Sequence, residues 1–108
     1  MARPGGHEGR KGKKMNISGV YDFTVSEIDG NGYQYYTGML EPERLDSHGM
    51  RFGTAFHISI DHKKQTSELC KFSWIGGAPH NFESLSKWKD EVLGPAEVET
   101  ILKKFGLL

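Results

Sequence analysis

The chain has 108 residues and a formal net charge of zero, with 36% hydrophobic and 26% charged residues. This length supports one domain with its own core, and the lack of an apolar run near the ~20 residues of a membrane span excludes a membrane-spanning chain. The single cysteine, Cys70, excludes an intrachain disulfide and a cysteine-cluster zinc site. The charged N-terminus lacks the apolar segment of a secretory signal, so we expect a cytoplasmic protein.

The N-terminal stretch is basic and rich in glycine. Residues 1–14 contain five Lys or Arg against one Glu, with four Gly. Such a composition cannot stabilise a fold of its own, so we predict that residues 1–15 are a disordered basic arm and that 16–108 form the domain. The alternative is a leader sequence, with Met15 as the natural first residue. A native arm would attract nucleic acid or an acidic surface through its cations. These cations include Arg10, Lys11, Lys13 and Lys14.

Residues 16–40 have the pattern of a β-hairpin. The apolar residues of the first arm alternate with polar ones, as in a half-buried strand. They are Tyr21, Phe23 and Val25. The sequence Asp-Gly-Asn-Gly at 29–32 is a strong hairpin-turn signal. It also matches the middle of a calcium-binding EF-hand loop, but Gly38 stands where that loop needs a bidentate Glu. We therefore favour the turn. A polar connection follows at residues 41–49, and loops of this length sometimes carry function.

Residues 50–75 predict a second, central hairpin. Apolar side chains occupy even positions on the first arm, and we assign the even positions of the second arm to the same face. The expected pairs are Ile60 with Cys70, Ile58 with Phe72, and Phe56 with Trp74. This register requires an odd-length connection around Lys63–Ser67, and it leaves Leu69 and Ile75 outside the alternation. Cys70 would then be an inert core thiol.

The C-terminal third changes to helical spacing. Residues 81–93 predict one helix, with Asn81 as N-cap and apolar side chains on one stripe. The stripe consists of Phe82, Leu85, Trp88 and Val92. Gly94 and Pro95 separate it from a second helix that ends near Gly106. The apolar stripe of that helix consists of Val98, Ile101, Leu102 and Phe105.

The order of elements predicts an α+β fold, in which a four-stranded antiparallel meander sheet precedes two C-terminal helices that pack on one face. We expect the helices to contact the central hairpin through one set of apolar side chains. This set is Phe56, Ile58, Phe72 and Trp74.

The polar face of the first central strand carries residue types that occur in catalytic and metal-binding sites. His57, Ser59 and Asp61 are residue types of a hydrolase, but neighbours at i and i+2 lie roughly 6.5–7 Å apart, too far for a ready His–Ser hydrogen bond. Residues 57–60, His-Ile-Ser-Ile, resemble one half of the paired motif of the 2H phosphoesterases, which need two copies, and no second copy occurs. A metal site would use His57, Asp61 and His62, although strand parity separates the two histidines. A solvated strand face explains the pattern better.

Three tyrosines on one strand, Tyr33, Tyr35 and Tyr36, occupy both of its faces, so at least one lies off the core. Tyrosine is enriched at protein interfaces, and open sheet edges also favour association. We therefore expect a non-enzymatic binding or interaction module without a cofactor, which forms a homo-oligomer. The alternatives are single-stranded nucleic-acid binding, by these tyrosines and the basic arm, and a small hydrolase that uses His57.

Overall fold

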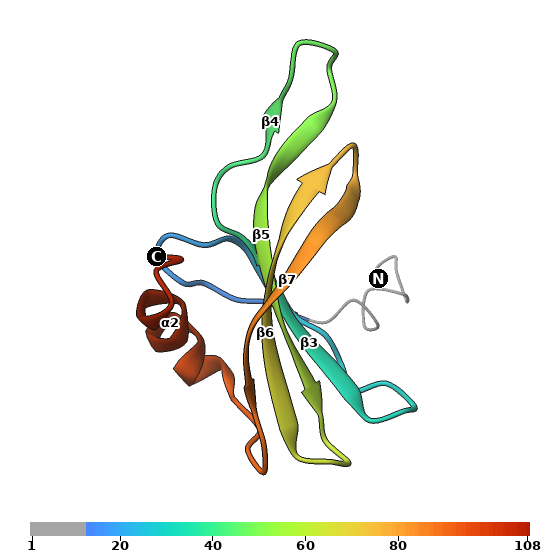
Figure 1. The fold of residues 1–108 in the computed structure, drawn as a ribbon, viewed down its shortest axis with the longest axis vertical. Helices are drawn as coiled ribbons and strands as arrows, with labels where there is room; N and C mark the ends of the chain where they lie inside the picture. The colour runs from blue at the N-terminus through green and yellow to red at the C-terminus, as the bar shows by residue number, and fades with distance from the viewer. Residues whose placement is uncertain (1–12) are drawn as a thin grey trace, which may run out of the picture.

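The computed structural model describes residues 13–108 and contains one antiparallel β-sheet and one helix (Figure 1). The strands follow one another across the sheet in the order β1-β2-β3-β5-β6-β7, and β4 pairs with β5 outside this path. The elements are β1 (Lys13–Lys14), β2 (Tyr21–Val25), β3 (Tyr33–Met39), β4 (Arg44–Leu45), β5 (Arg51–Asp61), β6 (Thr66–Ile75), β7 (Ala78–Trp88) and α2 (Pro95–Lys104).

The expected fold class is wrong in its balance of elements. The protein is mostly β, with six strands along the sheet instead of four, and the described residues form one short helix instead of two. The antiparallel arrangement of the sheet is confirmed. No helix in the described part of the chain is long and apolar enough to cross a membrane.

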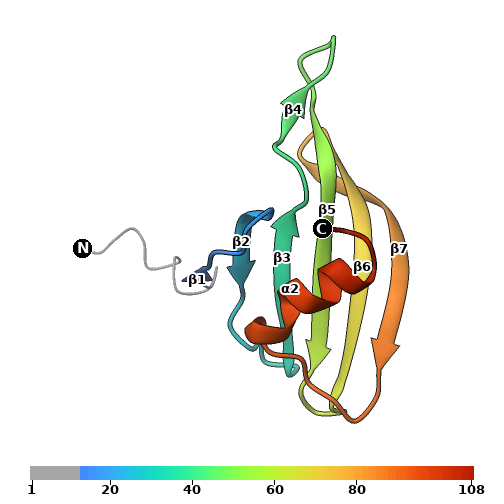
Figure 2. The same ribbon diagram turned by 90° about the vertical axis from the view of Figure 1, so that its left-hand side faces the viewer.

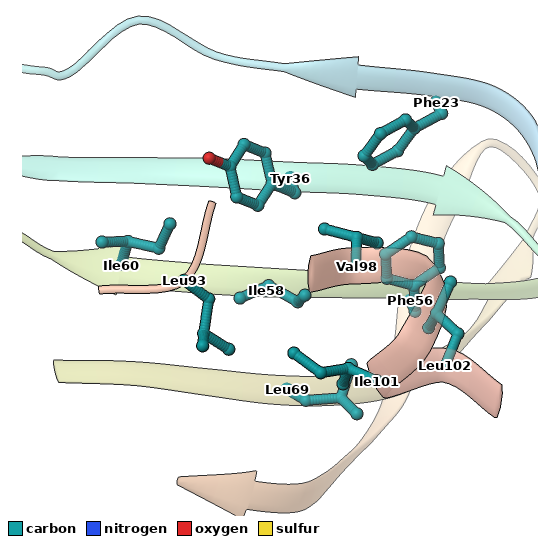
Figure 3. Packing of buried hydrophobic residues seen from close by; sticks show 10 residues of the cluster. All are labelled: Phe23, Tyr36, Phe56, Ile58, Ile60, Leu69, Leu93, Val98, Ile101 and Leu102. Carbon is teal, nitrogen blue, oxygen red and sulfur yellow. The ribbon is translucent and has the colours of Figure 1, made fainter. Parts of the chain in front are cut away.

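Helix α2 lies across one face of the sheet, which we call the core face (Figure 2). The sheet contributes buried side chains from four strands, and the helix and the segment before it contribute the remaining four residues of the cluster (Figure 3). The cluster consists of Phe23, Tyr36, Phe56, Ile58, Ile60, Leu69, Leu93, Val98, Ile101 and Leu102. The prediction that Phe56 and Ile58 face the helical layer is confirmed.

The second predicted helix is confirmed, and its ends follow the sequence signals. Pro95 stands in its first turn, where a missing N–H costs nothing. The Glu97 carboxylate accepts a hydrogen bond from the Gly94 N–H, which satisfies one of the free donors at the start of the helix. Gly106 follows the helix with φ +74°, a conformation that glycine adopts without steric cost.

The first predicted helix, residues 81–93, is wrong, because this segment provides most of strand β7. β7 pairs with β6 through two irregularities, one of which lies where Leu69 pairs with Ser86 and Cys70 with Ser84. Leu85 is the extra residue of that bulge. The bulge allows Leu85 and Trp88 to pack partly against the same core although they are three residues apart, a spacing typical of a helix.

The register of the central hairpin also differs from the prediction. Ile60 pairs with Ser67, and Ile58 pairs with Leu69, across a four-residue connection at 62–65 instead of an odd-length one. The shift places Leu69 in the core and turns Phe72 and Trp74 to the other face, because a change of one residue reverses the face of every side chain. The expected contact of Phe72 and Trp74 with the helical layer is therefore wrong.

The N-terminal part of the sheet follows the predicted hairpin with two changes. Phe23 is buried, but a shift in register between Tyr21 and Thr24 leaves Tyr21 largely exposed. The turn at 29–32 forms as expected, because the Asp29 carboxylate accepts hydrogen bonds from the Asn31 and Tyr33 N–H groups. The sheet extends beyond the predicted elements on either side: β1 lies within the proposed basic arm, and β4 lies within the expected 41–49 connection.

Candidate binding surface on the open sheet face

The sheet face opposite α2, which we call the open face, carries no other element among the described residues (Figures 1 and 2). Cross-strand pairs share a face, so the register assigns its residues. On β5 the open face includes Ala55, His57 and Ser59, which pair with Phe72, Cys70 and Glu68 of β6. The face is therefore a mixture of aromatic, small and charged side chains, unlike the purely solvated surface that the alternation of β5 predicts.

Five rings form a continuous strip across the open face, and we call them the ring strip. Tyr33 stacks on Tyr35 at 6.5 Å between ring centroids, and Tyr35 meets the edge of His57 at 6.1 Å. His57 lies 5.6 Å from Phe82, and Phe82 lies 4.9 Å from Phe72. The strip thus joins strands β3, β5, β6 and β7, and each successive pair lies within the range of favourable aromatic contacts.

The rings of the strip differ in their exposure to solvent. Phe72 is buried, with 5% of its surface exposed, whereas Phe82 is 54% exposed. Tyr33 and Tyr35 are also exposed, at 37% and 39%. A contiguous set of partly exposed rings on one face is the kind of surface that marks an interaction site, whereas scattered apolar residues do not.

His57 occupies the middle of the strip and behaves as an aromatic residue. Its side chain contacts the rings of Tyr35, Phe72 and Phe82. Burial lowers the pKa of the His57 imidazole below its ordinary value, and the nearby Glu68 carboxylate offsets only part of this effect. The neutral imidazole is therefore the dominant form at pH 7.

The other two members of the Ser/His/Asp pattern have different partners. The Asp61 carboxylate accepts hydrogen bonds from the Lys63 and Lys64 N–H groups at 3.0 Å each, and these bonds hold the pKa of Asp61 below its usual range. Within residues 13–108, no hydrogen bond joins His57 to Ser59 or Asp61. The structure therefore does not join these three side chains in the hydrogen-bonded arrangement of a catalytic triad.

The residues considered for a metal site are also separated. His62 forms a 2.8 Å hydrogen bond with the Gln34 side chain, away from His57. No group of three His, Cys, Asp or Glu able to hold a metal ion occurs among the residues that the structure describes. Cys70 lies beneath the open face, not in the helix-covered core as expected, and burial raises the pKa of its thiol.

Charged side chains line two hollows on either side of the ring strip. One hollow has a volume of about 290 Å³ and is lined by Lys64, Lys87 and Lys89. We call this part of the open face the lysine side. A second hollow has a volume of about 210 Å³ and is lined by Asp22 and Glu43, and we call that part of the face the acid side. The lysine side also contains two acids. They are Asp61 and Glu68.

The structure brings together some of the predicted binding residues and separates others. Tyr33, Tyr35 and His57 meet in the ring strip, whereas Tyr36 is in the core, where burial raises the pKa of its phenol. Lys13 and Lys14 form β1 beside β2, three strands away from His57. Arg10 and Lys11 lie outside the described residues.

Sequence reasoning missed Phe72 and Phe82. Phe82 fitted the helical spacing of 81–93, and Phe72 fitted the core face of the central hairpin. The available signal was the presence of large apolar residues at both odd and even positions, because such a strand has apolar side chains on both of its faces. Comparison with known protein families, curated proteins and solved structures finds no significant match to this chain.

Proposed function

We propose that this protein is a non-enzymatic binding module that self-associates, with the open face of one copy packed on the open face of a second. The observation that carries the proposal is the ring strip, which leaves three aromatic rings partly exposed on a sheet face that no other described element covers. Aromatic residues at the centre of a patch, with charged residues around them, are typical of protein interfaces.

The size of the open face supports a second copy of the chain as the partner. Strands β2, β3, β5, β6 and β7 have between 5 and 11 residues each. At a strand spacing of about 4.8 Å and a rise of about 3.3 Å per residue, they present on the order of 700 Å². Specific protein interfaces bury about 600–1,000 Å² on each partner. One face is therefore sufficient for a specific dimer without any rearrangement of the sheet.

Single-stranded nucleic acid is the second candidate, because the stacked Tyr33 and Tyr35 rings resemble a platform for bases. The charges of the face disfavour it. Three lysines stand against four acids around the ring strip, whereas a surface that binds nucleic acid is normally basic. A protein surface with both signs of charge complements this face better.

The test is sedimentation velocity of the purified full chain at about 100 μM, a concentration at which a specific interface is normally populated. We expect a dimer for the wild type and a monomer for Phe82→Asp, because the substitution places a charge in the ring strip. Leu45→Asp is the matched control: Leu45 is more exposed than Phe82 but lies on β4, and this variant should remain dimeric. Circular dichroism of each variant establishes that it is folded.

The same preparations decide between the two partners. A wild-type chain that is monomeric at this concentration contradicts self-association. If that monomer binds a labelled single-stranded oligonucleotide at low salt, and Phe82→Asp abolishes the binding, the open face is a nucleic-acid surface instead.

A further inference from the structure

The ring strip runs obliquely across the strands and divides the open face. At one end Tyr33 pairs with Asp61, the last residue of β5. Toward the other end Phe72 pairs with Ala55, six residues earlier on β5, and its neighbour Phe82 lies on the next strand. The Asp61 end of β5 borders the lysine side, and Ala55 borders the acid side. The two charged groups are thus separated by rings.

This division restricts how two identical copies can pack. A two-fold interface joins the same patch on both copies, so the patch must complement itself. An axis that lies in the interface and follows the strip places rings on rings, and lysine side on acid side. An axis perpendicular to the strip would place each charged side on its own counterpart, which is repulsive.

We propose that a second copy of this chain docks on the open face about a two-fold axis along the ring strip, so that Lys64 and Lys89 of one copy face Asp22 and Glu43 of the other. This inference rests on the proposed self-association and adds the groups that determine its orientation and specificity. The charged contacts occur twice in the dimer, once on each side of the axis.

The contacts that the charged side chains make within one copy leave those of the lysine side and the acid side able to interact with a second copy. Asp61, the acid nearest to Lys64, already accepts two backbone hydrogen bonds within its own turn. Lys87 stands opposite Glu68 in the register of β6 and β7, so it has a residue of opposite charge as its cross-strand neighbour within the copy. Among residues 13–108, the ion pair that Glu43 forms is a long, exposed contact of 3.7 Å with Arg51, which is worth little in water.

A charge-swap experiment tests the orientation. The basic-side variant K64E/K89E and the acid-side variant D22N/E43K are prepared as full chains. Asn is chosen at position 22 because Asp22 has φ 55°, which Asn tolerates and larger side chains do not. Each variant alone should dimerise about tenfold or more weakly than the wild type, because opposed charges are removed or become alike on both sides of the axis.

The mixture of the two variants is the decisive measurement. With one variant labelled and the other in excess, fluorescence-detected sedimentation should show a heterodimer close to wild-type affinity, because opposite charges face each other again on both sides of the axis. K103E/K104E, which changes the charge by the same amount as K64E/K89E but on α2, behind the sheet, should dimerise like the wild type. Wild-type dimerisation should also weaken as salt rises.

The outcomes separate this inference from the proposed function. If the wild type dimerises and Phe82→Asp does not, but both charge variants dimerise as well as the wild type, the orientation is wrong and self-association stands. The same holds if the mixture is as weak as each variant alone. A monomeric wild type overturns both.

Discussion

Gly38 lies where β3 crosses the packed interior, and its lack of a side chain is required there. A Cβ built at this position would lie 2.6 Å from Val20 Cγ1 and 3.0 Å from Phe56 Cε1. Both neighbours belong to the core or pack against it, so they have little room to move.

We therefore expect Gly38→Ala to lower the free energy of unfolding by about 1–3 kcal/mol, the usual cost of overpacking a core. Gly30→Ala is the matched control, because no atom lies within 4 Å of a Cβ built at Gly30. Urea unfolding of the two variants measures the difference. Equal stability of the two variants would show that the β3 crossing is not tightly packed.

His57 gives the protein a defined response to pH. Because its pKa is lowered in the folded state from 6.5, the unfolded chain binds more protons at pH values between the lowered pKa and 6.5. The free energy of unfolding contributed by this group is fully present above pH 6.5, and it is lost as the pH falls through that window.

Replacement of the imidazole by an amide removes this titration. We expect the stability of His57→Gln to change less than that of the wild type when the pH is lowered from 7.5 to 5, since the other titrating groups are the same in both chains. Urea midpoints at several pH values provide the measurement. Parallel pH profiles of the two proteins would mean that the His57 ring is not desolvated in the strip.

At the scale of the elements, Ser67 connects the sheet to the segment before α2. Its hydroxyl donates a hydrogen bond to the Glu91 carbonyl and accepts one from the Leu93 N–H, both at 3.1 Å. Ser67 is buried, so water cannot replace these bonds without some opening of the structure. The contact aligns the chain as it leaves β7 and turns toward the helix.

Ser67→Ala should therefore cost about 1–3 kcal/mol of stability, because it leaves the buried Leu93 N–H without its partner. The rate of hydrogen exchange should increase most at the Leu93 amide and in α2, because the substitution removes the hydrogen bonds that connect this segment to the sheet. Ser73→Ala, on the same strand and only half buried, serves as the control and should be nearly neutral. An equal increase in the exchange rate at all amides of Ser67→Ala would contradict a local role of Ser67 in holding this segment on the sheet.

Strand β7 shows why the sequence identified some elements and missed others. The alternation on β5 and the capping signals of α2 are local, and each was sufficient to predict its element. The bulge at Leu85 breaks the alternation of β7 and imitates a helical period. A bulge depends on the partner strand, so residues 81–93 alone do not reveal it.

At the scale of the molecule, one short helix covers a wide sheet. Ten helical residues extend about 15 Å, less than the width of five strands. The remaining core face is therefore closed at its margins by side chains outside the helix, including Met15, Ile17, Val20, Trp88 and Leu107. The open face has no equivalent cover among the described residues. Its ring strip is the reason that association with a second copy is the function we propose.

The amino-acid sequence was sufficient to predict strands β2, β3, β5 and β6, the turn at 29–32 and the C-terminal helix, because these depend on alternation, turn chemistry and capping within a few residues. The face that each strand buries depends on its pairing and packing in the folded sheet. Strand β6 carries Leu69 at one parity and Phe72 and Trp74 at the other, so its own pattern allows either register. Packing of α2 against Leu69 selects one register, and the same choice moves Phe72 to the open face and assembles the ring strip.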